Sequence, residues 1–125
     1  MSKVKVLVVD DSATVRQQVA MALGQAGFEV VQANDGLLGL EAITRDSDIK
    51  LVICDINMPR MNGLDMLAQV KADPKNAQLP VVMLTTEGQP ALMQRAKEHG
   101  AKGWVVKPFD AAQLAAAAKK LTGLA

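Results

Sequence analysis

Short apolar runs alternate with segments of helical periodicity along the whole chain, and this alternation limits the possible folds more than any other feature. The runs span residues 4–9, 28–33, 50–54, 80–84 and 102–106. Strands that alternate with helices indicate repeated βαβ units, which place parallel strands in one sheet with helices on both faces. The sequence therefore predicts an α/β fold with five strands and five helices.

The segments between the runs carry their own start and stop signals. The first helix is predicted to begin at Ser12 and to stop at Gly27, a residue that readily adopts the left-handed conformation. Asn34 or Asp35 is expected to cap the second helix. Its apolar face is expected to carry Leu37, Leu40 and Ile43. The other three helices are predicted at about residues 63–71, 90–98 and 111–121.

The composition of the runs indicates where each strand lies in the sheet. LVV, LVIC and VVML, within the first, third and fourth runs, are apolar at every position. Continuous apolar runs are typical of central parallel strands that helices cover on both faces. The second run, FEVVQA, alternates more and is predicted to be an edge strand.

Length, charge and hydropathy exclude several classes of protein. A chain of 125 residues fits one domain, and we expect residues 1–125 to form it. The net charge is +1 and no basic patch suggests nucleic-acid binding. No apolar run is long enough to cross a membrane and no secretory signal is evident, so we expect a cytoplasmic protein. The single Cys54 excludes an internal disulfide and is interpreted as a small core residue.

Polar residues gather at the predicted carboxyl ends of the strands. Asp10 and Asp11 end the first strand, Asp55 ends the third, and Lys107 follows the fifth. The fourth ends at Thr85 and Thr86. In an open parallel sheet these ends meet at one rim, where ligands bind. Three carboxylates, a hydroxyl and an ammonium are therefore expected in one cleft.

Crowded carboxylates either raise one another's pKa or recruit a cation. Because the expected ligands are all hard oxygens, the sequence favours Mg²⁺ over zinc, and such an ion leaves room for a phosphate oxygen. The pair Asp10 and Asp11 suits metal binding, whereas Asp55 stands alone and is the favoured nucleophile for phosphoryl transfer. Lys107 is expected to neutralise charge, and Thr85 to donate to a phosphoryl oxygen.

Four stretches carry a recognisable pattern: VDDSATVR, CDINMPRMNGLDML, VVMLTTE and WVVKPF. In this order and at these strand ends, they make the whole chain resemble the receiver domain of two-component response regulators, especially the single-domain chemotaxis regulators. The resemblance implies a doubly wound, flavodoxin-like (βα)5 fold with strand order 2-1-3-4-5.

The resemblance also implies a role for each acid at the rim. Asp55 looks like the phosphoacceptor and a Mg²⁺ ligand, Asp11 like a direct ligand, and Asp10 like a ligand that acts partly through water. The backbone carbonyl of Asn57 would complete the metal site. Asn57 and Glu87 flank the phosphoacceptor and are expected to tune the approach of the hydrolytic water.

A second group of residues resembles the family's switch. Thr85 looks like the switch hydroxyl, Lys107 like the partner of the phosphoryl group, and Trp104 like the switch aromatic. Pro108 resembles a family proline preceded by a cis peptide bond. Two positions depart from the common pattern: Trp104 is bulkier than the usual Tyr, Phe or His, and Thr86 replaces a smaller residue beside the site and is expected to restrict access.

The function implied is a phosphorylation-controlled binding module rather than an enzyme, apart from its own phosphorylation and dephosphorylation. A histidine kinase or phosphotransfer domain would supply the phosphoryl group. A downstream protein would bind the surface of the fourth helix, fifth strand and fifth helix, and the chain is expected to be a monomer.

Two other functions, an enzyme and a carrier, fit the sequence less well. A phosphatase of the haloacid dehalogenase type would use an Asp nucleophile at the end of the first strand in a D-x-D pattern, but Ser12 stands where its second Asp should be. A flavin or dinucleotide carrier would need a phosphate-binding loop after the first strand, where two carboxylates stand instead.

Overall fold

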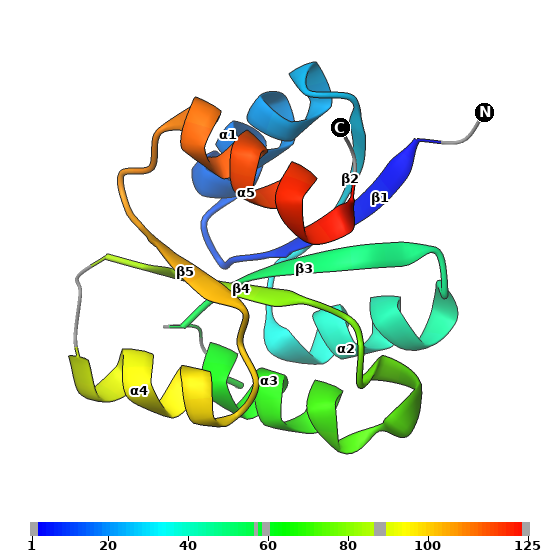
Figure 1. Cartoon of the computed structure of the whole chain (residues 1–125), viewed down its shortest axis with the longest axis vertical. Coiled ribbons are helices and arrows are strands. Elements are labelled where there is room, and N and C mark those ends of the chain that lie inside the picture. Colours follow the sequence, from blue (N-terminus) through cyan, green and yellow to red (C-terminus); the bar gives the residue numbers. More distant parts are fainter. Residues whose placement is uncertain (1–2, 57, 59–60, 87–89, 124–125) are drawn as a thin grey trace.

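One parallel sheet organises the chain. The computed structural model describes residues 3–56, 58, 61–86 and 90–123. Its strands pair in the order β2-β1-β3-β4-β5, and every pairing is parallel (Figure 1). The strands are β1 (Val4–Val9), β2 (Phe28–Ala33), β3 (Ile49–Asp55), β4 (Val81–Thr85) and β5 (Gly103–Val106). The predicted fold and strand order are confirmed, with β2 at one edge.

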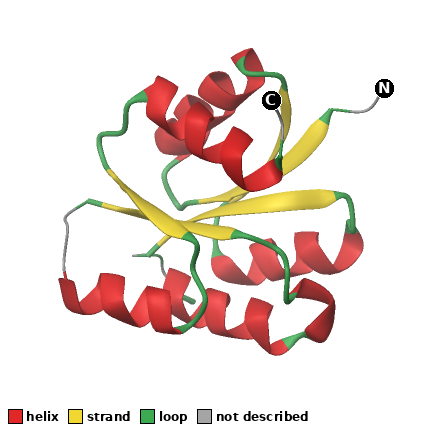
Figure 2. Cartoon of the chain, in the orientation of Figure 1, coloured by secondary structure: helices red, strands yellow, loops and turns green. Residues whose placement is uncertain are grey.

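Helices cover both faces of this sheet. On one face lie α1 (Ala13–Gln25) and α5 (Ala111–Thr122). On the other lie α2 (Gly36–Arg45), α3 (Gly63–Ala72) and α4 (Pro90–Glu98), and the short 3₁₀ helix η1 (Pro74–Asn76) follows α3 (Figure 2). Within the described part of the chain, no helix has the length and apolar character that a membrane crossing needs.

Short polar side chains begin most of these helices. Ser12 accepts a hydrogen bond from the backbone of Val15 at the start of α1, and Asn62 and Asp110 cap α3 and α5 in the same way. Asp35, not Asn34, caps α2. Each cap satisfies a backbone N–H that has no partner within the helix, which explains why the helices begin where they do.

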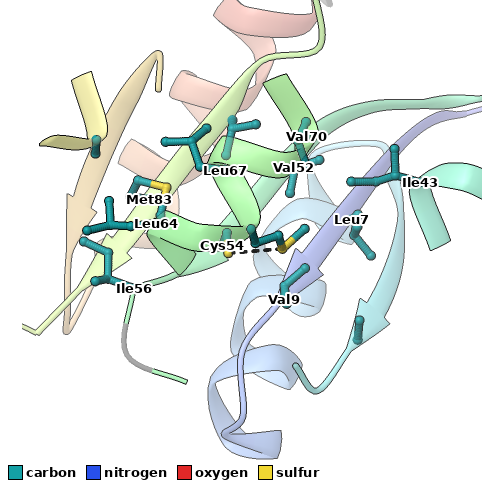
Figure 3. Packing of buried hydrophobic residues seen from close by; sticks show 14 of the residues in the cluster. Leu7, Val9, Ile43, Val52, Cys54, Ile56, Leu64, Leu67, Val70 and Met83 are labelled. Carbon is teal, nitrogen blue, oxygen red and sulfur yellow. Dashed lines mark hydrogen bonds between the residues drawn. The ribbon is translucent and has the colours of Figure 1, made fainter. Parts of the chain in front are cut away.

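Alternation along the strands divides the core into two layers. Leu7 and Val9 of β1 face the layer under α2, α3 and α4, whereas Val6 and Val8 face the layer under α1 and α5. Successive side chains of a strand point to opposite faces, so a continuous apolar run fills both layers. Figure 3 shows the first layer. Cys54 is buried there, as predicted, with its sulfur 3.6 Å from that of Met66.

The structure corrects one residue of the expected apolar face of α2, Leu37, whereas Ile43 is buried and Leu40 packs against the core as expected. Leu37 is 47% exposed, whereas Gly36, Gly39 and Ile43 are the buried residues of this helix. A Cβ added at Gly39 would lie 2.8 Å from the terminal methyl group of Met66. The helix therefore packs against its neighbours through its glycines, and this close approach turns Leu37 toward solvent.

Candidate functional site

Three carboxylates meet at the carboxyl ends of β1 and β3. One oxygen each from Asp10, Asp11 and Asp55 lies within 4.8 Å of the others. Asp10 and Asp55 are buried and Asp11 is exposed. The order 2-1-3 places the switch in strand order between β1 and β3, so the chain topology positions this cluster.

β3 and β4 each continue one residue past their apolar runs and end at the polar residues that the sequence predicts there. Asp55 pairs with Leu84, and Thr85 pairs with Val106, so both polar residues are the last residues of their strands. Backbone pairing continues to these positions because the peptide groups form ladder hydrogen bonds whatever the side chain is. Asp55 and Thr85 are therefore held by the rigid sheet and not by a loop.

Asp10 is fixed by hydrogen bonds on every side. Its backbone N–H donates to the carbonyl of Ala33 at 3.1 Å. Its Oδ1 accepts from the backbone N–H of Ser12 at 2.8 Å, and its Oδ2 accepts from Lys107 Nζ at 2.8 Å. Both carboxylate oxygens of this fully buried residue are thus engaged.

Lys107 joins the two buried acids. Its Nζ lies 2.8 Å from Asp10 Oδ2 and 3.3 Å from Asp55 Oδ1. Partial burial opposes the charge on Lys107, but the hydrogen bond from its ammonium to Asp10 and the attraction of Asp55 outweigh this effect and raise its pKa. The ammonium therefore stays charged and offsets part of the negative charge of the cluster. The peptide bond between Lys107 and Pro108 is cis, as the resemblance implies.

The fourth and fifth strands place the other predicted residues around this cluster. Thr85 is buried, and its carbonyl accepts from the backbone N–H of Lys107 at 2.6 Å. Thr86 is exposed. Trp104 lies on β5 with 39% of its surface exposed. Asn57 and Glu87 lie outside the described residues.

Cys54 adds no nucleophile to the site. It precedes Asp55 on β3 but points into the core layer of Figure 3. Burial raises the pKa of its thiol, and the nearby negative charges of Asp55 and Asp10 raise it further. The thiol therefore stays protonated and inert.

Two further residues contact the backbone of the acids at this site, and the sequence alone assigns no role to either of them. The Nη1 atom of Arg16 donates to the carbonyl of Asp10 at 2.6 Å. A Cβ added at Gly63 would lie 2.1 Å from the carbonyl oxygen of Asp55. The sequence signal for Arg16 is its position between the apolar helix positions Val15 and Val19. The signal for Gly63 is a poor helix former at the first position of a predicted helix.

The donor set fits a hard divalent cation. Carboxylate oxygens converge at the carboxyl ends of two neighbouring strands, and one of the three acids is exposed. Such oxygens suit Mg²⁺. Within the described residues, the Lys107 ammonium pairs with two of these three carboxylates, so the cluster keeps negative charge that a cation would offset.

Comparison with known proteins settles the family. The model of the response regulator receiver domain matches residues 6–119. The chain belongs to the response regulator receiver domain family. Receiver domains are two-component signalling proteins and not classical enzymes, and the family binds Mg²⁺ at its acidic pocket. Receiver domains of the CheY type interact with kinases and downstream targets.

Similar receivers are chemotaxis proteins. Chemotaxis protein CheY1 of Helicobacter pylori strain J99 is 42% identical over 106 residues, which cover 84% of this chain and 86% of that protein. The probable chemotaxis protein CheY of Rhizobium etli is 38% identical over 97% of this chain and 94% of its own. The crystallised CheY4 of Vibrio cholerae has a TM-score of 0.90 at 38% identity, covering 96% of this chain and 99% of its own.

Lys107 is expected to stabilise this receiver through Asp10. The Lys107 side chain is 15% exposed and pairs with the buried Asp10. The substitution Lys107→Met keeps an unbranched side chain of similar length but removes the ammonium from Asp10 Oδ2. Breaking such a pair from one side costs about 3 kcal/mol. Urea unfolding in Mg²⁺-free buffer should show this loss in the free energy of unfolding. The exposed Lys102→Met should change it by less than about 0.5 kcal/mol, and equal effects of the two substitutions would contradict this role.

Proposed function

We propose that Asp55 accepts a phosphoryl group from the phosphohistidine of a histidine kinase or phosphotransfer domain, and that this changes the affinity of the chain for a partner protein. The observation that carries the proposal is the position of Asp55 Oδ1, 3.3 Å from Lys107 Nζ and inside the three-carboxylate cluster. Residues 1–125 act as one receiver domain in this proposal.

Hydrogen bonds argue against Asp10 as the acceptor, and exposure argues against Asp11. Both oxygens of Asp10 already accept hydrogen bonds, from Ser12 and Lys107. Asp10 would be the nucleophile in a phosphatase of the haloacid dehalogenase type, so its engagement argues against that alternative. Asp11 is exposed to water, which suits a metal ligand better than a nucleophile that must avoid competing solvent.

Transfer and hydrolysis both pass through the Asp55 carboxylate. One of its oxygens bonds to phosphorus as the P–N bond of the phosphohistidine breaks, and the imidazole leaves with the electron pair and takes up a proton. Later a water oxygen bonds to phosphorus, the bond to Asp55 breaks, and inorganic phosphate departs with the carboxylate restored. Lys107 holds its positive charge beside Asp55 during both steps.

Mg²⁺ would be held by the carboxylates of Asp10, Asp11 and Asp55 and by the backbone carbonyl of Asn57. Asp10 would act partly through water. When bound, Mg²⁺ supplies positive charge that offsets the phosphoryl oxygens. Thr86, Asn57 and Glu87 are proposed to tune the approach of water to the phosphorylated residue.

Thr85 and Trp104 are proposed to carry the signal away from Asp55. The Thr85 hydroxyl would donate to a phosphoryl oxygen and draw the end of β4 inward, and Trp104 on the neighbouring strand would then repack. Trp104 and Val106 are 39% and 44% exposed, so β5 already offers apolar surface between α4 and α5. A near-complete switch requires a difference of about 5.5 kcal/mol between the interactions of the phosphoryl group with the two states.

The proposed partners follow from this surface and from the relatives. A histidine kinase loads Asp55 in the cytoplasm, and a target protein binds the surface of α4, β5 and α5, with no nucleic acid or membrane involved. The similar chemotaxis proteins favour a role in chemotaxis. The chain is proposed to act as a monomer.

Trp104 fluorescence tests the coupling between site and surface. The chain contains one tryptophan, so its emission reports on β5 alone. We expect beryllofluoride, a mimic of the phosphoryl group, to change this emission only with Mg²⁺ present, because repacking changes the exposure of the indole. The same titration on Thr85→Ala should give beryllofluoride binding with a reduced emission change. An unchanged emission in the wild type, with binding confirmed by calorimetry, would contradict the switch role of Trp104.

A further inference from the structure

Arg16 links three elements at the metal end of β1. It extends from α1, and its Nη1 donates to the carbonyl of Asp10 at 2.6 Å. Its Nε donates to Oε1 of Gln32 on β2 at 3.3 Å. The guanidinium of Arg16 is thus anchored to Gln32 on the edge strand β2 and at the same time fixes the backbone of Asp10, the residue that follows β1.

The carbonyl that Arg16 holds lies beyond the regular sheet. The last paired residue of β1 toward β3 is Val9, opposite Cys54. A buried carbonyl at this point needs a hydrogen-bond donor from a side chain. The planar guanidinium of arginine has several N–H donors, so Arg16 can bind this carbonyl and Gln32 at the same time. The backbone N–H and both carboxylate oxygens of Asp10 are held by Ala33, Ser12 and Lys107. Arg16 completes this set at the one remaining polar atom of Asp10.

The same carbonyl belongs to the peptide plane that joins Asp10 to Asp11. Because this plane is rigid, its orientation sets the position of the Asp11 backbone and so the place where the exposed Asp11 carboxylate meets the other two acids. Asp11 itself lies at a bend and is followed by Ser12, which caps α1. A group that fixes this peptide plane therefore also fixes the position of the Asp11 carboxylate.

We infer that Arg16 is a positioning residue of the Mg²⁺ site and acts through the Asp10 carbonyl. The inference rests on the proposed function, because it assumes that the three acids bind Mg²⁺. Groups that orient metal ligands typically change metal affinity by tenfold or more when removed.

A purely electrostatic role would have the opposite sign. Arg16 places a positive charge near a site for a cation, so loss of that charge alone would strengthen Mg²⁺ binding. Loss of positioning weakens it. The sign of the change in affinity therefore distinguishes the two roles.

The test measures Mg²⁺ binding by calorimetry, with Mg²⁺ as the only ligand. We expect Arg16→Gln to weaken binding about tenfold. Arg16→Lys, which keeps the charge and one donor, should recover part of the affinity. Gln32→Ala keeps the guanidinium but removes its second anchor and should weaken binding less than Arg16→Gln. Arg45→Gln, which removes the same charge from the exposed end of α2, should bind as the wild type does.

The outcomes separate this inference from the proposed function. If the wild type binds Mg²⁺ but Arg16→Gln binds it equally or more tightly, the positioning role is overturned, even where urea unfolding shows a less stable fold. If Arg16→Gln fails to fold, unchanged Mg²⁺ affinity in Gln32→Ala overturns it. If the wild type itself binds neither Mg²⁺ nor, with it, beryllofluoride, the proposed function fails and the role of Arg16 fails with it.

Discussion

Asp55→Asn is expected to abolish Mg²⁺-dependent binding of beryllofluoride. The asparagine amide has nearly the shape of the carboxylate but lacks the anionic oxygen that would bond to the phosphoryl mimic, and the cluster loses one of its three carboxylates. Calorimetry should detect no heat of beryllofluoride binding in this variant at concentrations that saturate the wild type. Chemical transfer to residue 55 should be lost completely for the same reason.

Asp48→Asn supplies the matched control for this loss. Asp48 is exposed and lies in the turn before β3, at the opposite end of that strand from Asp55. The substitution removes the same charge from the chain without touching the rim, so binding should match the wild type. Retained beryllofluoride binding in Asp55→Asn would show that another residue accepts the phosphoryl group.

Gly63→Ala is expected to destabilise the fold by about 4 kcal/mol or more, in the range reached only by severe packing faults. The added Cβ would lie 2.1 Å from the carbonyl oxygen of Asp55 and 2.9 Å from Cα of Ile56, and both are backbone atoms that no rotamer change can move. The N–H of Gly63 also donates to the Ile56 carbonyl at 2.8 Å. Relief of the clash must therefore move α3 away from the end of β3, which displaces Asp55. Urea unfolding measures the loss of stability.

Gly24→Ala provides the opposite result from the same chemical change. Gly24 lies in the last turn of α1, and a Cβ there would meet no atom within 4 Å. Because alanine is a better helix former, this variant should be more stable than the wild type, by up to about 1 kcal/mol. A Gly63→Ala protein that is as stable as Gly24→Ala would contradict the close packing of α3 on the phosphoacceptor strand.

The sequence predicts much of this fold because its strongest patterns are local. Alternation of strand and helix requires only the apolar periods, and parallel strands bring their carboxyl ends together whatever the detailed register is. The sequence alone therefore predicts that Asp10, Asp55 and Lys107 lie close together. The sequence limits the cap of α2 to Asn34 or Asp35, because the pattern that marks a helix start spans only a few residues. The structure shows that the cap is Asp35.

The remaining features depend on contacts between distant segments. The hydrogen bond from Arg16 to the Asp10 carbonyl requires the position of a guanidinium, which helical periodicity does not set. The exposure of Leu37 follows from the close packing of Gly39, a tertiary contact. Trp104 is apolar enough for a core, yet β5 leaves it 39% exposed. The role of Gly63 depends on how closely α3 approaches β3, which no local pattern records.

Phosphoryl transfer from phosphoramidate tests the central claim most directly. This small donor carries the same P–N bond as phosphohistidine, so no kinase is needed. The wild type is incubated with the donor, with Mg²⁺ or with a chelator, and the modified residue is located by mass spectrometry of its peptides. We expect one phosphoryl group on Asp55, formed only with Mg²⁺ and absent from Asp55→Asn. A phosphoryl group on Asp10 or on any other residue, or none at all, would contradict the account.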